Sequence, residues 1–193
     1  MVFGFSVFKK GFRTLGIAES YVRGVHKYSL LAGVIMRSDL IIDGFTFTYI
    51  TVGGFDSTER ILSMYRNLNR NDINLIMLNG AIIGWYNIVD IYKLYNCIRK
   101  PIIVVSYEES EGIEKYIKKY FPQDYKERLE LYRKLGEREM IKIKTGYKVY
   151  IRYIGIDKKQ AIVALNRLTL NGSIPEPLRV AKILAHAAIK AKQ

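Results

Sequence analysis

The sequence has little cysteine, proline or histidine, with one, four and two of them among 193 residues. The single Cys97 excludes an intramolecular disulfide and any zinc site built from several cysteines. His26 and His186 are far apart and have no ligand spacing around them, which favours surface or packing roles over catalysis. Long apolar runs are also lacking, because residues 75–78 and 102–105 are much shorter than a bilayer requires. We therefore expect no membrane-spanning segment and no membrane partner.

The first twelve residues, MVFGFSVFKKGF, are apolar before they are basic and lack a small-residue cleavage pattern. They do not match a secretory signal, so we expect a cytoplasmic location. The composition, 49% hydrophobic and 25% charged, is ordinary for a globular protein of one well-buried core. We predict one domain over residues 1–193, in which residues 108–193 form a helical and hairpin extension.

Acidic residues are few beside basic ones, with 18 Asp and Glu against 31 Lys and Arg, a net charge of +13. Such an excess attracts phosphate backbones, so nucleic acid, and DNA in particular, is the expected partner. A chain rich in Lys, Glu, Ile and Tyr is also typical of thermophilic proteins, which recruit charge into surface networks. Charge alone leaves both interpretations open, and it does not indicate an oligomeric state.

The first half of the chain has the pattern of an α/β protein. Three apolar runs predict strands at residues 13–19, 29–37 and 40–52, and their short connections predict an antiparallel meander. After Gly53-Gly54 we expect a helix to residue 68, a strand at 74–78, a helix at 87–99 and a strand at 101–107. Strands alternating with helices require parallel pairing with right-handed crossovers. A three-strand meander followed by parallel strands is the ribonuclease H-like arrangement.

The second half is more charged. We expect helices at residues 112–120 and 125–139, a hairpin of 140–144 and 147–156, and helices at 157–168 and 179–192.

Acidic residues at predicted strand ends are the candidates for chemistry. Glu19 ends the first strand, Asp39 and Asp43 flank the start of the third, and Asp56 follows the glycine pair. Carboxylates that converge on one crevice can hold Mg²⁺ and position a water on a scissile phosphate. Alternatively, Asp56 caps a helix while Asp39 and Asp43 belong to turns. Asn79 ends the fourth strand, where its neutral oxygen is a weaker ligand than a carboxylate.

Other residues are candidates for contacts with nucleic acid. Trp85 and Tyr86 have side chains that stack on a base or wedge into a duplex, although an aromatic pair at a turn is often partly buried packing. Asn87 is expected near the same crevice. A basic face interleaved with tyrosines suits a phosphate backbone, but solvated helix surfaces also explain many basic residues. The residues we single out from it are Lys142, Lys144, Lys148 and Arg152.

Four segments carry a resemblance to a known family. RTLGIAES (13–20), TVGGFDSTERI (51–61), LNGAIIGWYNIVDI (78–91) and PIIVV (101–105) resemble, in this order, the archaeal domain-of-unknown-function family 99, also called endonuclease dU. The resemblance covers roughly the first 110 residues. It implies a ribonuclease H-like fold related to endonuclease V and a metal-dependent endonuclease of DNA repair. The implied reaction is Mg²⁺- or Mn²⁺-dependent hydrolysis of a phosphodiester near uracil or hypoxanthine.

The family's motifs match this chain with departures. Its strand-end acid falls on Ala18-Glu19, and its Gly-x-Asp-x-Thr segment matches at Gly54, Asp56 and Thr58. Its Leu-Asp-Gly has Asn79 in place of the acid, and its Gly-Phe-Asn-Val-Val-Asp matches residues 84–90 with an inserted aromatic residue and Ile for Val.

The resemblance implies a catalytic set of Glu19, Asp56 and Asn79. The implied metal ligands are Asp56 and Glu19. The positions of the acids in the sequence add Asp43 or Asp39 as a candidate for a further ligand. Asn79 favours an alternative function, a catalytically silent nucleic-acid-binding protein of the same fold.

Overall fold

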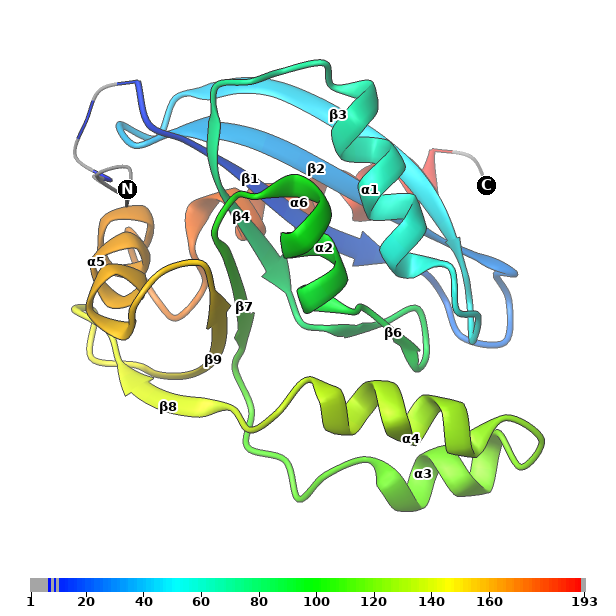
Figure 1. The fold of residues 1–193 in the computed structure, drawn as a ribbon. Helices are drawn as coiled ribbons and strands as arrows, with labels where there is room; N and C mark the ends of the chain where they lie inside the picture. Colours follow the sequence, from blue (N-terminus) through cyan, green and yellow to red (C-terminus); the bar gives the residue numbers. More distant parts are fainter. Residues whose placement is uncertain (1–6, 8, 10, 192–193) are drawn as a thin grey trace.

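The computed structural model describes residues 7, 9 and 11–191 of the chain and shows one seven-stranded sheet with helices on both faces (Figure 1). Its strands, in the order β3-β2-β1-β4-β7-β9-β8, are β1 (Arg13–Ser20), β2 (Tyr28–Arg37), β3 (Ile42–Thr51), β4 (Ile73–Asn79), β7 (Ile102–Ser106), β8 (Glu139–Lys142) and β9 (Lys148–Ile154). The helices are α1 (Ser57–Asn67), α2 (Ile91–Ile98), α3 (Glu114–Tyr120), α4 (Tyr125–Lys134), α5 (Lys158–Leu168) and α6 (Glu176–Lys190).

The sheet topology confirms the predicted ribonuclease H-like class. β1, β2 and β3 form an antiparallel meander, β4 is parallel to β1, and β7 is parallel to β4. The two crossovers place the carboxyl ends of β1, β4 and β7 side by side, at the same end of these parallel strands. Glu19 lies there, near the end of β1, and Asn79 is the last residue of β4. The sheet therefore positions these two predicted site residues on neighbouring strands.

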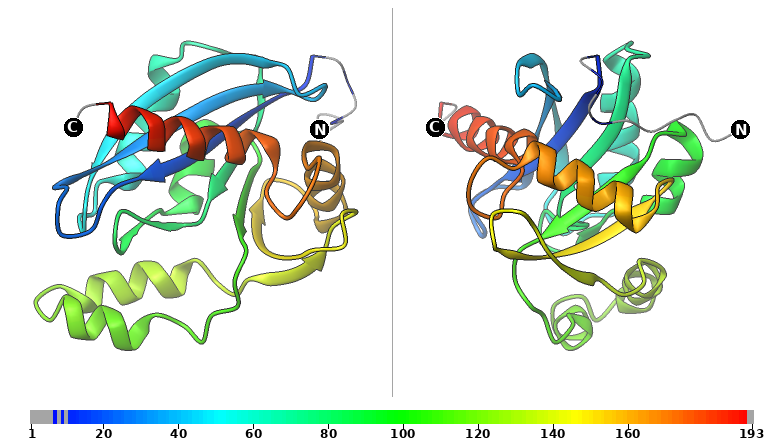
Figure 2. Two further views of the ribbon diagram at one scale, coloured as in Figure 1. Left: turned by 180° about the vertical axis from the view of Figure 1, so that it is seen from behind. Right: turned by 90° about the vertical axis from the view of Figure 1, so that its left-hand side faces the viewer.

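The central strands are buried on both faces, which explains their runs without polar alternation. One core cluster includes Leu15, Leu78 and Val104 and packs against α1 and α2. A second cluster includes Met77 and Val105 and packs against α5. Helix α6 crosses β1 and β2 on the face opposite α1, as Figure 2 shows from behind.

A two-strand hairpin, β5 (Ile82–Ile83) and β6 (Asn87–Ile88), was not predicted from the sequence. It corrects the helix expected at 87–99, which begins only at Ile91, where Asp90 accepts a hydrogen bond from the Lys93 amide at 3.0 Å. The loop between the strands has positive φ at Gly84, Trp85 and Tyr86 (49°, 56° and 66°). Bulky side chains rarely adopt such angles, so this turn is held by its surroundings.

The second half of the chain is joined to the main sheet. The predicted hairpin is present as β8 and β9, and β9 pairs with β7. Helices α3 and α4 form a pair that projects beyond the sheet at the bottom of Figure 1. Residues 108–193 thus contribute two strands of the sheet and, in α6, the cover of β1 and β2. Within the described residues, no helix is long and apolar enough to cross a bilayer.

Candidate functional site

The carboxyl ends of β1 and β4 enclose a small pocket that contains two predicted site residues. Glu19 and Asn79 both line it, together with the apolar side chains of Ile17, Leu31, Ile61, Leu78, Ile83 and Val89. Asn79 and Gly80 also line an open cleft at the end of β7, where Ser106, Glu108 and Arg138 lie. The crevice expected from the sheet topology therefore exists, and it contains one acid and one amide from the predicted set.

Glu19 is largely buried and only partly hydrogen-bonded. Its Oε2 accepts hydrogen bonds from the Ser29 hydroxyl at 2.6 Å and from the Gly84 amide at 2.7 Å. Burial raises the pKa of Glu19 above its ordinary value, although these two bonds and the charge of Lys182 act in the opposite direction. A desolvated carboxylate of this kind costs stability, and such groups are common at functional sites.

Asp56 has a different environment, because its carboxylate is hydrogen-bonded within the turn after β3. Its oxygens accept from the backbone N–H of Thr51 at 3.0 and 3.2 Å, from the Thr51 hydroxyl at 3.1 Å and from the Asn87 amide at 2.8 Å. Arg60 lies 3.5 Å away as an ion-pair partner. Burial raises the pKa of Asp56, but the bonds from Asn87 and Thr51 outweigh it and hold that pKa below its ordinary value.

Asn87 joins the turn after β3 to the β5–β6 hairpin. Its side chain is completely buried, donates to the Thr51 carbonyl at 2.9 Å and to Asp56, and accepts from the Ser57 amide at 3.1 Å. Ser57 is the first residue of α1, so the Asn87 oxygen occupies the place of a capping side chain. Asn87 was predicted as a contact for nucleic acid, and its burial instead makes it a structural residue.

The hairpin contacts both predicted acids, each through a different residue. Gly84 donates its amide to Glu19 and accepts from the Gly53 amide at 2.6 Å, while Asn87 binds Asp56. Glu19 faces the strand-end pocket, whereas Asp56 faces the turn that it stabilises.

Asp39 and Asp43 do not lie at this end of the sheet. Because β3 is the third strand of the antiparallel meander, its first residues lie at the same end of the sheet as the start of β1. There Asp43 pairs with Arg13 and with Arg70. Hydrogen bonds from Arg13 and Arg70 lower the pKa of Asp43. Asp39 pairs with Arg37 at 2.6 Å in the turn between β2 and β3. Asp39 therefore agrees with the turn alternative, whereas Asp43 belongs to β3, and the structure does not bring Asp43 to Glu19.

A divalent metal would need several of these acids as ligands at one place. Across the part of the chain that the structure describes, no group of three or more His, Cys, Asp or Glu side chains is placed to hold a metal ion. Asp56 is occupied by the turn, Asp43 lies at the other end of the meander, and Asn79 offers a neutral oxygen beside Glu19. The donor set does not fit the carboxylate cluster that Mg²⁺ or Mn²⁺ would need.

Trp85 and Tyr86 pack in an aromatic cluster with helix α3 and the residue that follows it. The Trp85 ring lies 5.7 Å from Tyr120 and 5.0 Å from Phe121, measured between centroids, and the Arg23 guanidinium lies 4.9 Å from the Trp85 centroid. Both residues are only partly buried. The packing alternative therefore describes their rings in this structure, and Arg23 adds a cation beside the exposed part of the cluster.

A buried arginine attaches α4 to this region. Arg128 is 2% exposed, pairs with Asp124, and donates to the carbonyls of Gly53, Gly54 and Tyr86 at 2.6 to 3.1 Å. Its guanidinium lies 3.9 Å from the centroid of the Phe121 ring. The sequence signal, one more Arg in a helix with many charges, does not distinguish it from a solvated residue.

The predicted basic residues separate into two kinds. Lys142, Lys144 and Lys148 are exposed at the tip of the β8–β9 hairpin, and Lys142 is the direct cross-strand partner of Lys148. Arg152 is instead half-buried, and it donates two hydrogen bonds to the Gly136 carbonyl at 2.9 and 3.0 Å. Burial lowers the pKa of Arg152. Arg152 thus holds the backbone of the segment between α4 and β8.

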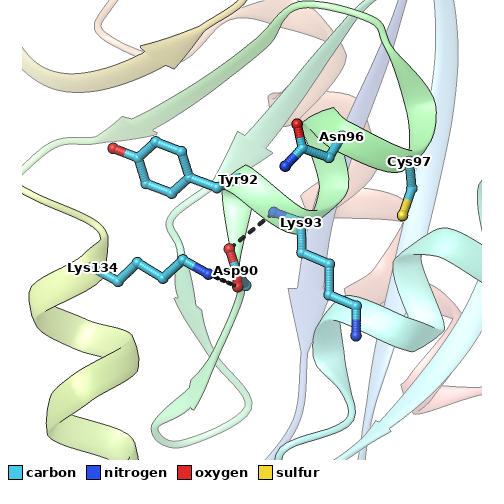
Figure 3. Close-up of a pocket in the computed structure, with 6 residues that line it drawn as sticks. All are labelled: Asp90, Tyr92, Lys93, Asn96, Cys97 and Lys134. Atoms are coloured by element: carbon cyan, nitrogen blue, oxygen red, sulfur yellow. Dashed lines mark hydrogen bonds and ion pairs between the residues drawn. The ribbon is translucent and has the colours of Figure 1, made fainter.

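A further hollow lies between α2 and α4 (Figure 3). Lys134 of α4 reaches Asp90 at 2.6 Å, and Lys93 pairs with Glu59 of α1. Cys97 is exposed at its border. Both lysines that line the hollow have acidic partners, and these ion pairs join α2 to α4 and to α1.

The strand order and the two crossovers define a protein of ribonuclease H-like fold. The model of the family Endonuclease dU matches residues 10–189, and the chain belongs to this family.

The chain is similar to several known proteins. A UPF0215 protein of Pyrobaculum aerophilum is 41% identical over 175 residues, which cover 90% of this chain and 92% of the relative. A crystal structure of a protein of unknown function from Archaeoglobus fulgidus has a TM-score of 0.79 at 26% identity and covers 92% of this chain and 98% of its own. Endonuclease V of Ciona intestinalis, crystallised with a DNA that contains inosine, has a TM-score of 0.64 at 14% identity, with 94% of this chain and 87% of that chain covered.

Proposed function

We propose that this protein binds nucleic acid, in the first instance DNA, without efficient hydrolysis of phosphodiesters. The observation that carries the proposal is the lysine tip, which we define as Lys142, Lys144 and Lys148. Lys142 and Lys148 are directly opposed in the antiparallel pair, and like charges in that position destabilise a hairpin. Among the residues that the structure describes, none of the three has an ion-pair partner. A phosphate backbone is an anion that would neutralise this tip.

The lysine tip lies beside α5 and the loop that follows it. Tyr150 of β9 is paired with Ser106, the last residue of β7, and Lys148 lies two residues further out. The tip therefore extends past the last pair between β7 and β9. There the Lys144 amide donates to the Asn166 side chain of α5, and the Thr145 hydroxyl donates to the Gly172 carbonyl.

We expect weak catalysis because few carboxylates at the crevice are available as metal ligands. Hydrolysis with bound divalent metal needs several carboxylates that converge on the scissile phosphate. Glu19 is the one carboxylate in its pocket, since the other polar side chain there is Asn79, and Asp56 is used by the turn. Related proteins crystallised with DNA support the binding part of the proposal.

Binding is tested by fluorescence anisotropy with labelled duplex and single-stranded DNA in the presence of a chelator. We expect affinity to persist without metal and to fall steeply with salt. Replacing the lysine tip by glutamine should reduce the slope of log K against log[salt] by about 2 to 3. The matched control replaces Lys126, Lys159 and Lys190, which are also exposed, on α4, α5 and α6. Equal losses in both triple variants would show that net charge alone binds DNA and would overturn the role of the tip.

A second candidate is a metal-dependent endonuclease of DNA repair that acts on uracil- or hypoxanthine-containing DNA with Mg²⁺ or Mn²⁺. The favouring observation is that Glu19 and Asn79 line one pocket at the ends of neighbouring parallel strands. Membership of the Endonuclease dU family supports the same candidate.

Cleavage assays with labelled deaminated DNA distinguish the two candidates. We expect the protein and its Glu19→Gln variant to be equally inactive with either metal. Cleavage by the protein that is lost in Glu19→Gln would overturn the first candidate and establish the second. The variant Asn79→Asp adds a carboxylate beside Glu19, and calorimetry should then detect tighter Mg²⁺ binding than in the protein itself. Unchanged metal affinity would show that these two positions do not share an ion.

A further inference from the structure

Strand β3 forms one edge of the sheet and has an unusual surface. Its side chains at alternate positions, Phe45, Phe47 and Tyr49, are 50%, 46% and 38% exposed. They lie on one face because residues at spacing two share a face of a strand. Within the described residues, β3 pairs only with β2, so its second edge has unpaired backbone groups.

Helix α6 stops short of this aromatic face. Val34 and Ala32 of β2 are the cross-strand partners of Phe45 and Phe47, and Val34 is buried in the cluster that contains Ala181 of α6. The view from behind in Figure 2 shows α6 lying across β1 and β2 with β3 beyond it. The aromatic face of β3 thus continues the sheet surface past the end of its helical cover.

Beyond the bulge at Asp43, the strand lacks the charges and prolines that normally protect an edge. Residues 44–55 contain no charged side chain and no proline, in a chain with a net charge of +13. Lysines, prolines and inward-pointing charges are the usual means by which edge strands avoid pairing. At its start, Asp43 is neutralised by Arg13 and Arg70. Charge repulsion, which would keep two copies of so basic a protein apart elsewhere, is therefore absent along β3.

We propose that β3 pairs with the β3 of a second copy of this chain, so that one sheet runs through a two-fold symmetric dimer. The chemistry favours a second copy over nucleic acid, because phosphate backbones need cations beside the stacking rings and β3 has none. An antiparallel pair centred on Phe47 places Phe47 opposite its own copy. The same register places Phe45 opposite Tyr49 of the partner, twice by symmetry.

This register is specified by the side chains. Shifting the pairing by one residue would place the aromatic face of one copy beside the opposite face of the other. Shifting the centre from Phe47 to residue 46 would leave Tyr49 opposite Asp43, so fewer rings would face each other. Aromatic cross-strand pairs stabilise antiparallel strands, and an interface built on the two-fold axis uses the same patch twice.

The mass in solution tests the proposal. Light scattering after size exclusion should give twice the protomer mass at high concentration, and the Phe47→Glu variant should dissociate, with the dimer dissociation constant raised by roughly a hundredfold. The control Leu170→Glu introduces the same charge at a side chain that is 60% exposed in the loop before α6 and should remain dimeric. Circular dichroism checks that both variants are folded.

Cross-linking tests the register. In a Cys97→Ser background, Phe47→Cys should give a covalent dimer with a short thiol cross-linker, because the two copies of residue 47 face each other, whereas Leu170→Cys should not. A protein that stays monomeric at every concentration would overturn the proposal. A monomer whose Phe47→Glu variant loses affinity for single-stranded DNA would assign this face to nucleic acid instead.

Discussion

Two carboxylates near the ends of strands, Glu19 and Asp56, have opposite relations to the fold. Asp56 accepts three hydrogen bonds from Thr51 and one from Asn87, and its pKa is held below the ordinary value. Glu19 is more deeply buried, accepts two bonds through one oxygen, and has a raised pKa. Asp56 stabilises a turn, whereas the burial of the Glu19 carboxylate lowers the stability of the fold. Among acids at a crevice, the second kind is the better candidate for function.

The largest expected effect concerns the network around Asp56. Asn87→Ala removes an amide that makes three hydrogen bonds. It leaves the Ser57 N–H without its partner and the Thr51 carbonyl with the Gly54 amide alone. We expect a loss of about 3 kcal/mol in the free energy of unfolding, which denaturant titration measures. Asn96→Ala, on the exposed side of α2, is the matched control and should change stability by less than about 0.5 kcal/mol. A loss below 1 kcal/mol for Asn87→Ala would contradict the structural role of this network.

The sheet could be predicted from the sequence, but the difference between Glu19 and Asp56 could be predicted only in part. Strands β1 to β3 were predicted from apolar runs with short connections, and β4 and β7 from apolar runs that alternate with helical patterns. The β5–β6 hairpin was missed because strands of two residues have no periodicity. That hairpin supplies both Gly84 and Asn87, so the partners of the two acids could not be derived. Asp43 was placed at the crevice although the third strand of a meander begins at the end where the first begins.

A smaller effect is expected from Asp56→Asn, which keeps the shape and removes the charge. The variant retains an oxygen for the Thr51 amide and for Asn87, so we expect a cost of about 1 kcal/mol at neutral pH. Because the folded pKa of Asp56 is lowered, its contribution is present above the ordinary value of 3.8 and is lost as the pH falls through the folded pKa. Denaturant titrations of both proteins should therefore converge at acidic pH. A difference that is independent of pH would mean that the charge of Asp56 does not stabilise the turn.

The smallest expected effect comes from Glu19→Gln, which should raise the stability of the fold instead of lowering it. A carboxyl whose pKa is raised by folding binds its proton more tightly in the native state, so stability falls as the pH rises from the ordinary value of 4.5 through the folded pKa. A neutral amide avoids this cost, and its oxygen can still accept from Ser29 and from the Gly84 amide. We expect the variant to melt at a higher temperature than the protein at neutral pH and at the same temperature well below pH 4.5. Destabilisation at neutral pH would place Glu19 with Asp56, as a second acid that the fold requires, and would remove the stability argument for a functional role at the end of β1.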